Sequence, residues 1–441
     1  MKKYILFFVL QLTSISIYSQ LFFNEVSSSF DFNHSYFQGV SGAGLSFADF
    51  NNDGLDDISI PTNNDNSLIF FQNNGTKLIP QNFNINLPGQ IKQVLWIDYD
   101  NDNDKDLHVT SFQGKNKLYR NNGYFYFTDV TSALNLPDSI SNSFGASWAD
   151  INNDGYLDLL QTYRSNDSLV NTIKVFLSDS ALSFNEITAS ANITEPGKLP
   201  FCVSFIDIDN NNILDLYIAN DKSSGNSLYY NNGDLTFTNI SSSSNTGLQM
   251  DAMSVTPGDF NNDTYFDIYS TNLEDGNKFF INNKDLSFTE NADNIGISFN
   301  GQAWGAQFED FDLDGFEDLY VSGALVGSEV PSSAYYSNIF GKYFEENNSI
   351  GLNSDTVASY GNAIGDIDNN GIPDIAVLNM YPHKSFIFKN TYSGNNNWLK
   401  VKLIGHNSNR DAYGTRLVLY SSDLILSRAK FSSEGYLSQN S

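Results

Sequence analysis

The sequence contains little cysteine, histidine and positive charge, and each shortage excludes a class of protein. One cysteine and four histidines in 441 residues exclude a disulfide scaffold and a cysteine-rich zinc site. The 23 basic residues are outnumbered by 51 acidic residues, which gives a net charge of −28. Nucleic acid is therefore excluded as a partner, because phosphate binding needs a basic surface.

The acidic composition does not indicate disorder. Disordered acidic chains have few aromatic residues, whereas Phe, Tyr and Trp make up 14% of this chain, and prolines number only 10. The chain can therefore bury a large core, and the question becomes where its carboxylates lie.

Residues 1–19 have the pattern of a secretory signal peptide. Lys2 and Lys3 precede the apolar run 4–12, and a small polar stretch ends at Ser19. The run is too short to span a bilayer, and no other stretch approaches about 18 consecutive apolar residues. We expect a secreted or cell-surface protein without a transmembrane segment. The alternative reading of this run is a buried N-terminal strand.

A nine-residue acidic loop recurs seven times, at a mean spacing of about 53 residues. Its pattern is Asp at position 1, Asp or Asn at positions 3 and 5, usually Gly at position 6, and Asp at position 9. A bulky apolar residue stands two positions before six of the loops, and a short strand-like run follows each one. The loops begin at Asp49, Asp98, Asp150, Asp207, Asp259, Asp310 and Asp366.

The sequence around the loops predicts about four short strands per repeat. Asn-Asn-Gly turns, as in 121–123 and 231–233, separate β-rich runs, and Asn and Gly tolerate the positive φ of hairpin turns. Four strands in about 50 residues are typical of a propeller blade. The predicted fold is therefore all-β, a seven-bladed β-propeller over residues 20–390.

The ends of the chain predict how the ring closes. The seventh repeat lacks an outer strand, and residues 21–26 (LFFNEV), before the first loop, supply one. We expect this N-terminal strand to complete the last blade and so remove an open sheet edge. The alternative is an open solenoid, whose terminal repeats should resemble caps.

The loops have the ligands that calcium prefers. Carboxylate and carboxamide oxygens on alternate residues suit Ca²⁺ at six- to eight-fold coordination, whereas Mg²⁺ prefers fewer carboxylates and more water. The loops contain no His or Cys, which argues against zinc and copper. An EF-hand is excluded, because position 12 is never acidic. The remaining alternative is a set of turns that bind no ion.

The loops, with aromatic-Gly pairs at 144–145, 304–305 and 360–361 before three of them, resemble FG-GAP/VCBS repeats, which build the integrin alpha-subunit propeller. The resemblance implies Ca²⁺ ligation by the side chains at positions 1, 3, 5 and 9 and by the backbone carbonyl of position 7. The implied ligands, in up to seven sites, are Asp49, Asn51, Asp53, Leu55, Asp57, Asp98, Asp100, Asp102, Asp104, Asp106, Asp150, Asn152, Asp154, Tyr156, Asp158, Asp207, Asp209, Asn211, Ile213, Asp215, Asp259, Asn261, Asp263, Tyr265, Asp267, Asp310, Asp312, Asp314, Phe316, Asp318, Asp366, Asp368, Asn370, Ile372 and Asp374.

The repeats stop after Asn390, and a polar linker (391–397) leads to a more basic segment. Residues 397–420 predict alternating strands around a Gly-containing turn. With Trp398, Gly414 and the run 435–439, residues 398–441 resemble the start of an ASPIC/UnbV domain, as in cartilage acidic protein-like secreted proteins. We expect this domain to be incomplete.

No motif for catalysis stands out. The four histidines are dispersed, Cys202 reads as a small buried residue, and no nucleophile-elbow, Walker or zincin motif occurs. We expect a monomeric, non-enzymatic calcium-binding module for adhesion to an extracellular protein or glycan. The alternatives are a Ca²⁺-dependent polysaccharide lyase or glycosidase and a structural shell protein. Sugar stacking by Tyr163, Tyr335 or Tyr336 is less expected than their packing in the fold.

Overall fold

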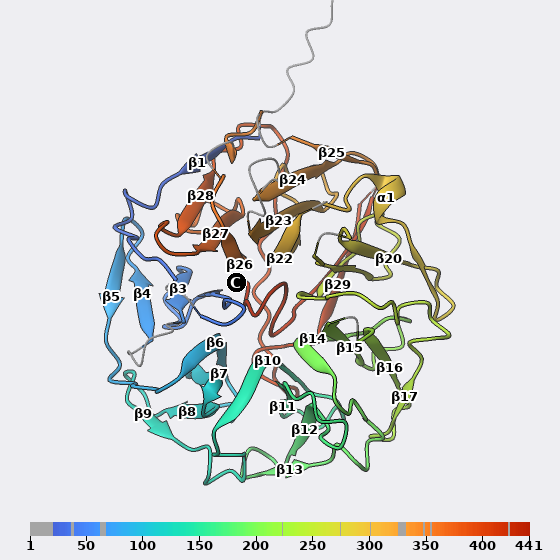
Figure 1. The fold of residues 1–441 in the computed structure, drawn as a ribbon. Coiled ribbons are helices and arrows are strands. Elements are labelled where there is room, and N and C mark those ends of the chain that lie inside the picture. The colour runs from blue at the N-terminus through green and yellow to red at the C-terminus, as the bar shows by residue number, and fades with distance from the viewer. Residues whose placement is uncertain are drawn as a thin grey trace, which may run out of the picture.

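The computed structural model describes residues 21–36, 39–61, 68–222, 224–273, 275–299, 301–324, 332–346, 349–352, 355–421 and 424–441. The strands surround a central axis, and the C-terminus lies at the centre (Figure 1). The signal peptide predicted for residues 1–19 lies outside the described residues. Within them, no helix is long and apolar enough to cross a membrane.

The strands form antiparallel four-stranded units. In the described residues, five units are separate sheets, and two more are joined through β7 and β10 into one eight-stranded sheet. The prediction of an all-β fold is confirmed, since the one helix in the described part of the chain is the single turn α1 (Ala292–Ile295).

From the inner to the outer strand, the units consist of β2 (Ser46–Ala48), β3 (Asp57–Ile60), β4 (Ile69–Asn73) and β5 (Leu78–Gln81); β6 (Gln90–Ile97), β7 (Asp106–Gly114), β8 (Lys117–Asn121) and β9 (Phe127–Asp129); β10 (Ser141–Ala149), β11 (Asp158–Tyr163), β12 (Ile173–Ser178) and β13 (Phe184–Glu186); β14 (Leu199–Ile206), β15 (Asp215–Asp221), β16 (Ser227–Asn231) and β17 (Phe237–Asn239); β18 (Thr256–Gly258), β19 (Asp267–Ser270), β20 (Lys278–Asn282) and β21 (Phe288–Glu290); β22 (Gln302–Glu309), β23 (Asp318–Ala324), β24 (Ser333–Asn338) and β25 (Tyr343–Glu345); and β26 (Ser359–Gly365), β27 (Asp374–Asn379), β28 (Phe386–Asn390) and β1 (Phe23–Glu25).

The N-terminal strand closes the ring. β1 pairs antiparallel with β28, with Phe23 opposite Asn390 and Glu25 opposite Phe388. The predicted pairing of residues 21–26 with the last repeat is therefore confirmed. Strands from the first and last parts of the chain therefore share one sheet, and β1 covers the edge of β28.

The core lies between neighbouring units, where the apolar residue two positions before a loop packs against the preceding unit. The buried Trp96 of β6 donates its indole N–H to Ser59 Oγ of β3 at 2.8 Å. Trp148 of β10 donates in the same way to His108 Nδ1 of β7 at 3.2 Å. Each sheet is thus covered on both faces, which explains strands buried along most of their length.

The aromatic-Gly pairs position the inner strands around the axis. The aromatic rings meet there: Trp304 lies 5.2 Å from Tyr360, and Phe144 lies 4.9 Å from Phe201, between ring centroids. A Cβ atom on Gly145 would lie 2.4 Å from the carbonyl oxygen of Phe201. Glycine at this position therefore allows neighbouring inner strands to approach closely.

Beyond the last unit, the chain forms the hairpin β29 (Arg416–Tyr420) and β30 (Ile425–Ala429) and then returns to the axis. Within 397–420, the prediction of alternating strands around a Gly-containing turn is wrong for residues 398–404, which form no strand. A strand needs a neighbouring strand to satisfy its backbone N–H and C=O groups. β29 pairs with β30 and not with residues 398–404.

Asparagines at the end of the third strands connect neighbouring units. Asn282 donates its side-chain N–H groups to the carbonyl of Phe266 at 3.2 Å in its own unit and to that of Ile208 at 2.8 Å in the unit before. The equivalent connections between units are made by Asn73 to Ile367, Asn338 to Phe260 and Asn390 to Phe311.

Replacing one of these asparagines should destabilise the ring. Asn282→Ala leaves two carbonyl groups without their donor, and each unsatisfied buried group costs about 1–3 kcal/mol. We expect the free energy of unfolding to fall by about 2–4 kcal/mol in denaturant titration. The control is Asn283→Ala, because the Asn283 side chain is exposed and bonds only within its own hairpin. Equal effects of the two substitutions would contradict the role assigned to Asn282.

Candidate metal centres

All seven acidic loops join the first strand of a unit to the second. Each second strand begins at the Asp of loop position 9, as β3 does at Asp57 and β27 at Asp374. Neighbouring loops also bond to each other, because the side chain of Asn101 at position 4 donates to the carbonyl of Gly155 in the next loop at 3.0 Å. The loops therefore lie next to one another at the same end of the units.

The carboxylate at position 1 holds each loop closed. In the first loop, Asp49 accepts the backbone N–H of Asp53 at 3.0 Å and that of Gly54 at 2.9 Å. The same two bonds, to positions 5 and 6, occur in the other six loops. The chain thus curls around the Asp at position 1, as the alternating oxygen pattern requires.

Two positions in each loop adopt the left-handed backbone conformation. Position 6 is usually Gly, which tolerates this conformation, and Gly54 and Gly155 have φ values of 89° and 94° there. Position 4 does so as well, with Asn52 at 58° and Asn101 at 62°. The sequence reasoning missed this second turn, although its signal was present: Asn stands at position 4 in six of the seven loops, and Asn tolerates positive φ.

The Asp at position 9 is buried and connects the loop to the sheet. Asp57 accepts the N–H of Phe50 from its loop at 3.1 Å and that of Asn73 from the third strand at 2.7 Å. The bond to the third strand is present in every unit. In one unit the position-9 carboxylate has a further partner that the sequence did not reveal, since Tyr335 donates its hydroxyl to Asp318 at 2.6 Å.

Four loops bring three carboxylates together closely enough to hold one metal ion. In each, one oxygen per residue lies within 4.8 Å of the others; the groups are Asp98, Asp100 and Asp106; Asp207, Asp209 and Asp215; Asp310, Asp312 and Asp314; and Asp366, Asp368 and Asp374. The remaining three loops have Asn at position 3, which supplies a neutral oxygen in place of a carboxylate.

Some of these oxygens are buried without a hydrogen-bond donor. Among the described residues, Asp100 Oδ1 in the second loop and Asp368 Oδ1 in the seventh have no such partner. A buried carboxylate oxygen without a partner is costly, and a cation would satisfy it. The oxygen-only donor set therefore fits Ca²⁺. The carboxylates that come together are those of positions 1, 3 and 9 in three loops and of positions 1, 3 and 5 in the sixth loop.

Burial raises the pKa of the position-9 carboxylates. The pKa is raised to about 8 for Asp57 and to about 9 for Asp106, mainly because burial penalises the charged form; neighbouring loop aspartates raise it further. A metal ion beside these carboxylates would favour their charged form and lower the pKa again.

The seventh loop differs from the others because lysines reach its carboxylates. Lys389 forms an ion pair with Asp368, and Lys400 lies 3.6 Å from Asp366. The fifth loop has one such contact, between Lys284 and Asp263 at 3.3 Å. The second and sixth loops, which have four aspartates at the ligand positions, are the strongest metal candidates.

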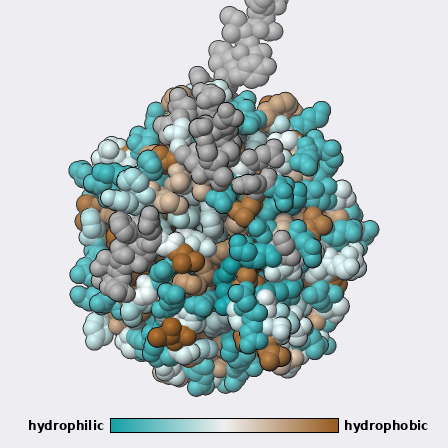
Figure 2. Space-filling view, viewed as in Figure 1, coloured by the Kyte–Doolittle hydropathy of each residue, from teal (hydrophilic) through white to brown (hydrophobic). Residues whose placement is uncertain are grey.

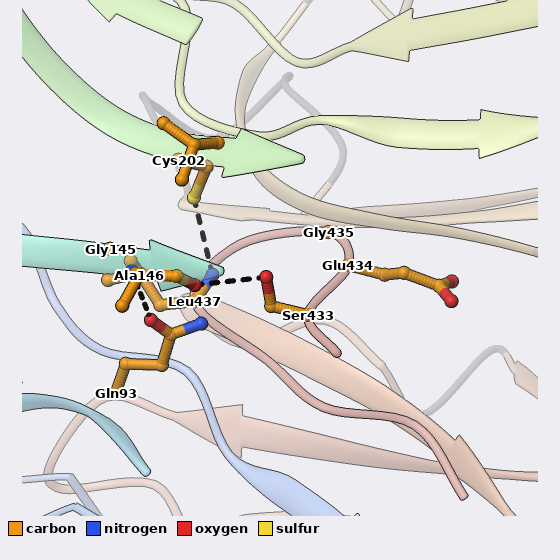
Figure 3. Close-up of a pocket in the computed structure, with 9 residues that line it drawn as sticks. Gln93, Gly145, Ala146, Cys202, Ser433, Glu434, Gly435 and Leu437 are labelled. Carbon is orange, nitrogen blue, oxygen red and sulfur yellow. Dashed lines mark hydrogen bonds between the residues drawn. The ribbon is translucent and has the colours of Figure 1, made fainter. Parts of the chain in front are cut away.

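His108 and Cys202, two of the groups considered for catalysis, lie in different units. His108 is buried between Trp148 and Gln161, and burial lowers its pKa to about 3. Cys202 borders a small cavity at the axis (Figure 3), and burial raises the pKa of its thiol to about 12. Tyr335 and Tyr336 are buried, which excludes sugar stacking by either in this structure, and Tyr163 is half-buried.

Hydrophobic side chains are scattered among hydrophilic ones on the face shown in Figure 2, without forming one large patch. Hydrophobicity alone therefore does not mark this face as a binding face.

The chain is similar to solved structures of low sequence identity. It matches BBS1N, from its crystal structure in complex with ARL6DN soaked with lead, at 12% identity over 86% of this chain and 99% of that one, with a TM-score of 0.50. It also matches an Agrocybe aegerita lectin that recognises non-reducing terminal N-acetylglucosamine, at 16% identity over 76% and 88% of the two chains and a TM-score of 0.46. The V. cholerae biofilm matrix protein Bap1 matches at 14% identity over 79% and 45%, with a TM-score of 0.36. At these identities the likeness concerns the fold alone, which is β-propeller-like.

No curated protein matches the sequence. The family model of the FG-GAP-like repeat matches residues 49–109, 98–160, 207–270 and 259–321. These matches cover the first six loops and more than half of the chain. The protein therefore belongs to the FG-GAP-like repeat family.

Proposed function

We propose that the protein is a secreted or cell-surface calcium-binding β-propeller of seven blades that acts as a non-enzymatic interaction module for an extracellular protein or glycan. The observation that carries the proposal is the closure of all seven loops around the Asp at position 1, with aspartate oxygens converging beside it. Closure gathers negative charge in one place, and a divalent cation offsets this charge.

The four-stranded units around the axis support the blade number. One acidic loop belongs to each unit, and β1 completes the unit of the seventh loop. Ligation by the position-7 carbonyl, as in Leu55 or Phe316, remains a prediction from the family resemblance. So does the assignment of residues 398–441 to a partial ASPIC/UnbV domain.

The proposal of a non-enzymatic role is supported by the structural use of the loop carboxylates. The loop aspartates are engaged in closing loops and binding strands, and His108 and Cys202 are buried in different units. Export is supported by the family, since FG-GAP repeats are typical of extracellular proteins. BBS1N, which shares the fold, was solved in complex with another protein.

Removal of calcium should lower the stability of the protein. A metal that binds only the folded state stabilises it by about 2.7 kcal/mol per site at 100-fold excess over its dissociation constant. We expect a lower melting temperature after treatment with chelator and recovery when Ca²⁺ is restored. Mg²⁺ at the same concentration serves as the control and should restore less. An unchanged melting temperature would remove calcium from the proposal.

The loops should differ in affinity. Asp98→Ala should cause a larger loss of Ca²⁺ binding than Asp207→Ala, because the second loop has four aspartates at its ligand positions and the fourth has three, with Asn211 at position 5. Both variants lose the same two closing hydrogen bonds, so the difference reports the ion. Calorimetric titration measures it, and equal losses would refute the ranking.

The alternative from the sequence is a calcium-dependent carbohydrate-active enzyme. Incubation of the purified protein with a panel of polysaccharides in the presence of Ca²⁺ separates the two functions. We expect neither new reducing ends nor the ultraviolet absorbance of unsaturated lyase products, and retention of the protein on an immobilised glycan would then indicate binding without turnover. Turnover that disappears with chelator would establish the enzyme instead.

A further inference from the structure

Residues Ser432–Asn440, here called the axial segment, run through the centre of the ring (Figure 1). The segment bonds to the inner edge of every four-stranded unit. Its hydrogen-bond partners on the seven units include Ser46, Phe47, Trp96, Trp148, Ala146, Cys202, Val255, Gln307 and Ile364.

Part of this contact is backbone pairing of the kind that a bound peptide makes with a sheet edge. Gly435 donates its N–H to the carbonyl of Val255 at 2.9 Å. Gln439 donates its N–H to Leu45 at 3.1 Å and accepts that of Phe47 at 2.9 Å. The segment therefore joins two different units through its main chain.

The side chain of Gln439 is fully satisfied although it is 1% exposed. Its oxygen accepts the N–H of Trp96 at 2.9 Å and the hydroxyl of Ser46 at 2.8 Å. Its nitrogen donates to the carbonyl of Trp96 at 2.9 Å and to the hydroxyl of Tyr413 at 3.0 Å. These four bonds use both lone pairs and both protons of the amide, so that an aliphatic side chain could not replace it.

The ring of Tyr436 is buried among aromatic side chains of the inner strands. Its centroid lies 5.0 Å from that of Trp304 and 5.8 Å from that of Phe201, in edge-to-face arrangements. Its hydroxyl donates to the carbonyl of Ser41. Tyr436 thus fills an aromatic site with a polar end, which specifies tyrosine rather than a smaller residue.

The fit around the segment is close. Figure 3 shows the gap that remains between Gln93, Gly145 and Cys202 on one side and residues 433–437 on the other. Its volume is about 10 Å³, room for no more than about one water molecule. A Cβ atom on Gly44 would lie 1.9 Å from the carbonyl oxygen of Leu437, so the channel wall is shaped to the peptide.

We propose that the axial channel is a peptide-binding site, occupied in this chain by its own residues 432–440, with Tyr436 and Gln439 as the two anchor residues. The site recognises a segment that turns tightly around Tyr436, since Glu434 donates its N–H to the carbonyl of Ser438 at 3.1 Å and Gly435 and Leu437 have φ values of 62° and 54°. The segment carries Tyr and Gln three residues apart. The proposal goes beyond calcium binding and does not depend on it, because none of the contacts described for the segment involves a loop ligand.

The test uses the full chain after it has folded. A protease recognition sequence is inserted between Ser421 and Leu424, in the connection between β29 and β30, and cleaved in the folded protein. We expect residues 424–441 to stay bound during size-exclusion chromatography. A labelled synthetic peptide of residues 424–441 should then exchange with the resident fragment, which is followed by fluorescence anisotropy.

All substitutions are made in the peptide, so that folding of the ring is not at risk. Tyr436→Ala and Gln439→Ala should each weaken binding of the peptide by at least about tenfold, which corresponds to about 1.4 kcal/mol. Ile425→Ala is the control, because Ile425 is exposed in β30, and it should bind like the unchanged peptide. Loss of the fragment on cleavage, or equal binding of the anchor and control peptides, would overturn the proposal.

Discussion

The buried aspartate at the ninth loop position is the interaction on which the rest of the structure depends. Asp57 shows its geometry: one oxygen receives an N–H from its own loop, and the other receives that of Asn73 from the third strand. Desolvation of the charged carboxylate is costly, and two hydrogen bonds offset only part of this cost, which is why the pKa rises to about 8. Loop, second strand and third strand therefore share one charge, and compensation of that charge stabilises all three together.

The net charge of −28 follows from this arrangement. Positions 1, 3, 5 and 9 of the seven loops hold 23 of the 51 acidic residues. At neutral pH these side chains repel one another unless cations accompany them, and seven Ca²⁺ ions would supply +14. Protonation can relieve the same repulsion, but only by neutralising the groups one at a time. The acidity is thus a property of the architecture rather than of the surface alone.

The sequence could predict what is local. The loop pattern, the strands after each loop and the N-terminal strand that closes the ring all depend on short stretches or on their order along the chain. The asparagine at the end of the third strand was interpreted only as part of a turn. Its side chain bonds to the preceding unit, as Asn282 does to Ile208, and no local sequence pattern indicates a contact between residues so far apart in the chain. Asn at position 4 of six loops could have indicated the left-handed turn there. It was overlooked because the Gly at position 6 already accounted for a turn in the loop.

The segment after the repeats was interpreted from its resemblance to a known domain, which could not predict its contacts with the acidic loops. Two units supply a carboxylate from position 8 to the first amide of the preceding loop: Glu317 binds the N–H of Asp259 at 2.6 Å, and Asp56 binds that of Asp366 at 2.8 Å.

The second loop has no such neighbour, since position 8 of the third loop is Leu157. Asp411 supplies the missing carboxylate to the N–H of Asp98 at 2.7 Å, and Lys105 pairs with the same side chain. The C-terminal segment thus completes the loop that is richest in aspartate, as well as occupying the axis. Asp411 thus compensates for Leu157 at position 8 of a distant repeat. This dependence becomes apparent only in the assembled ring.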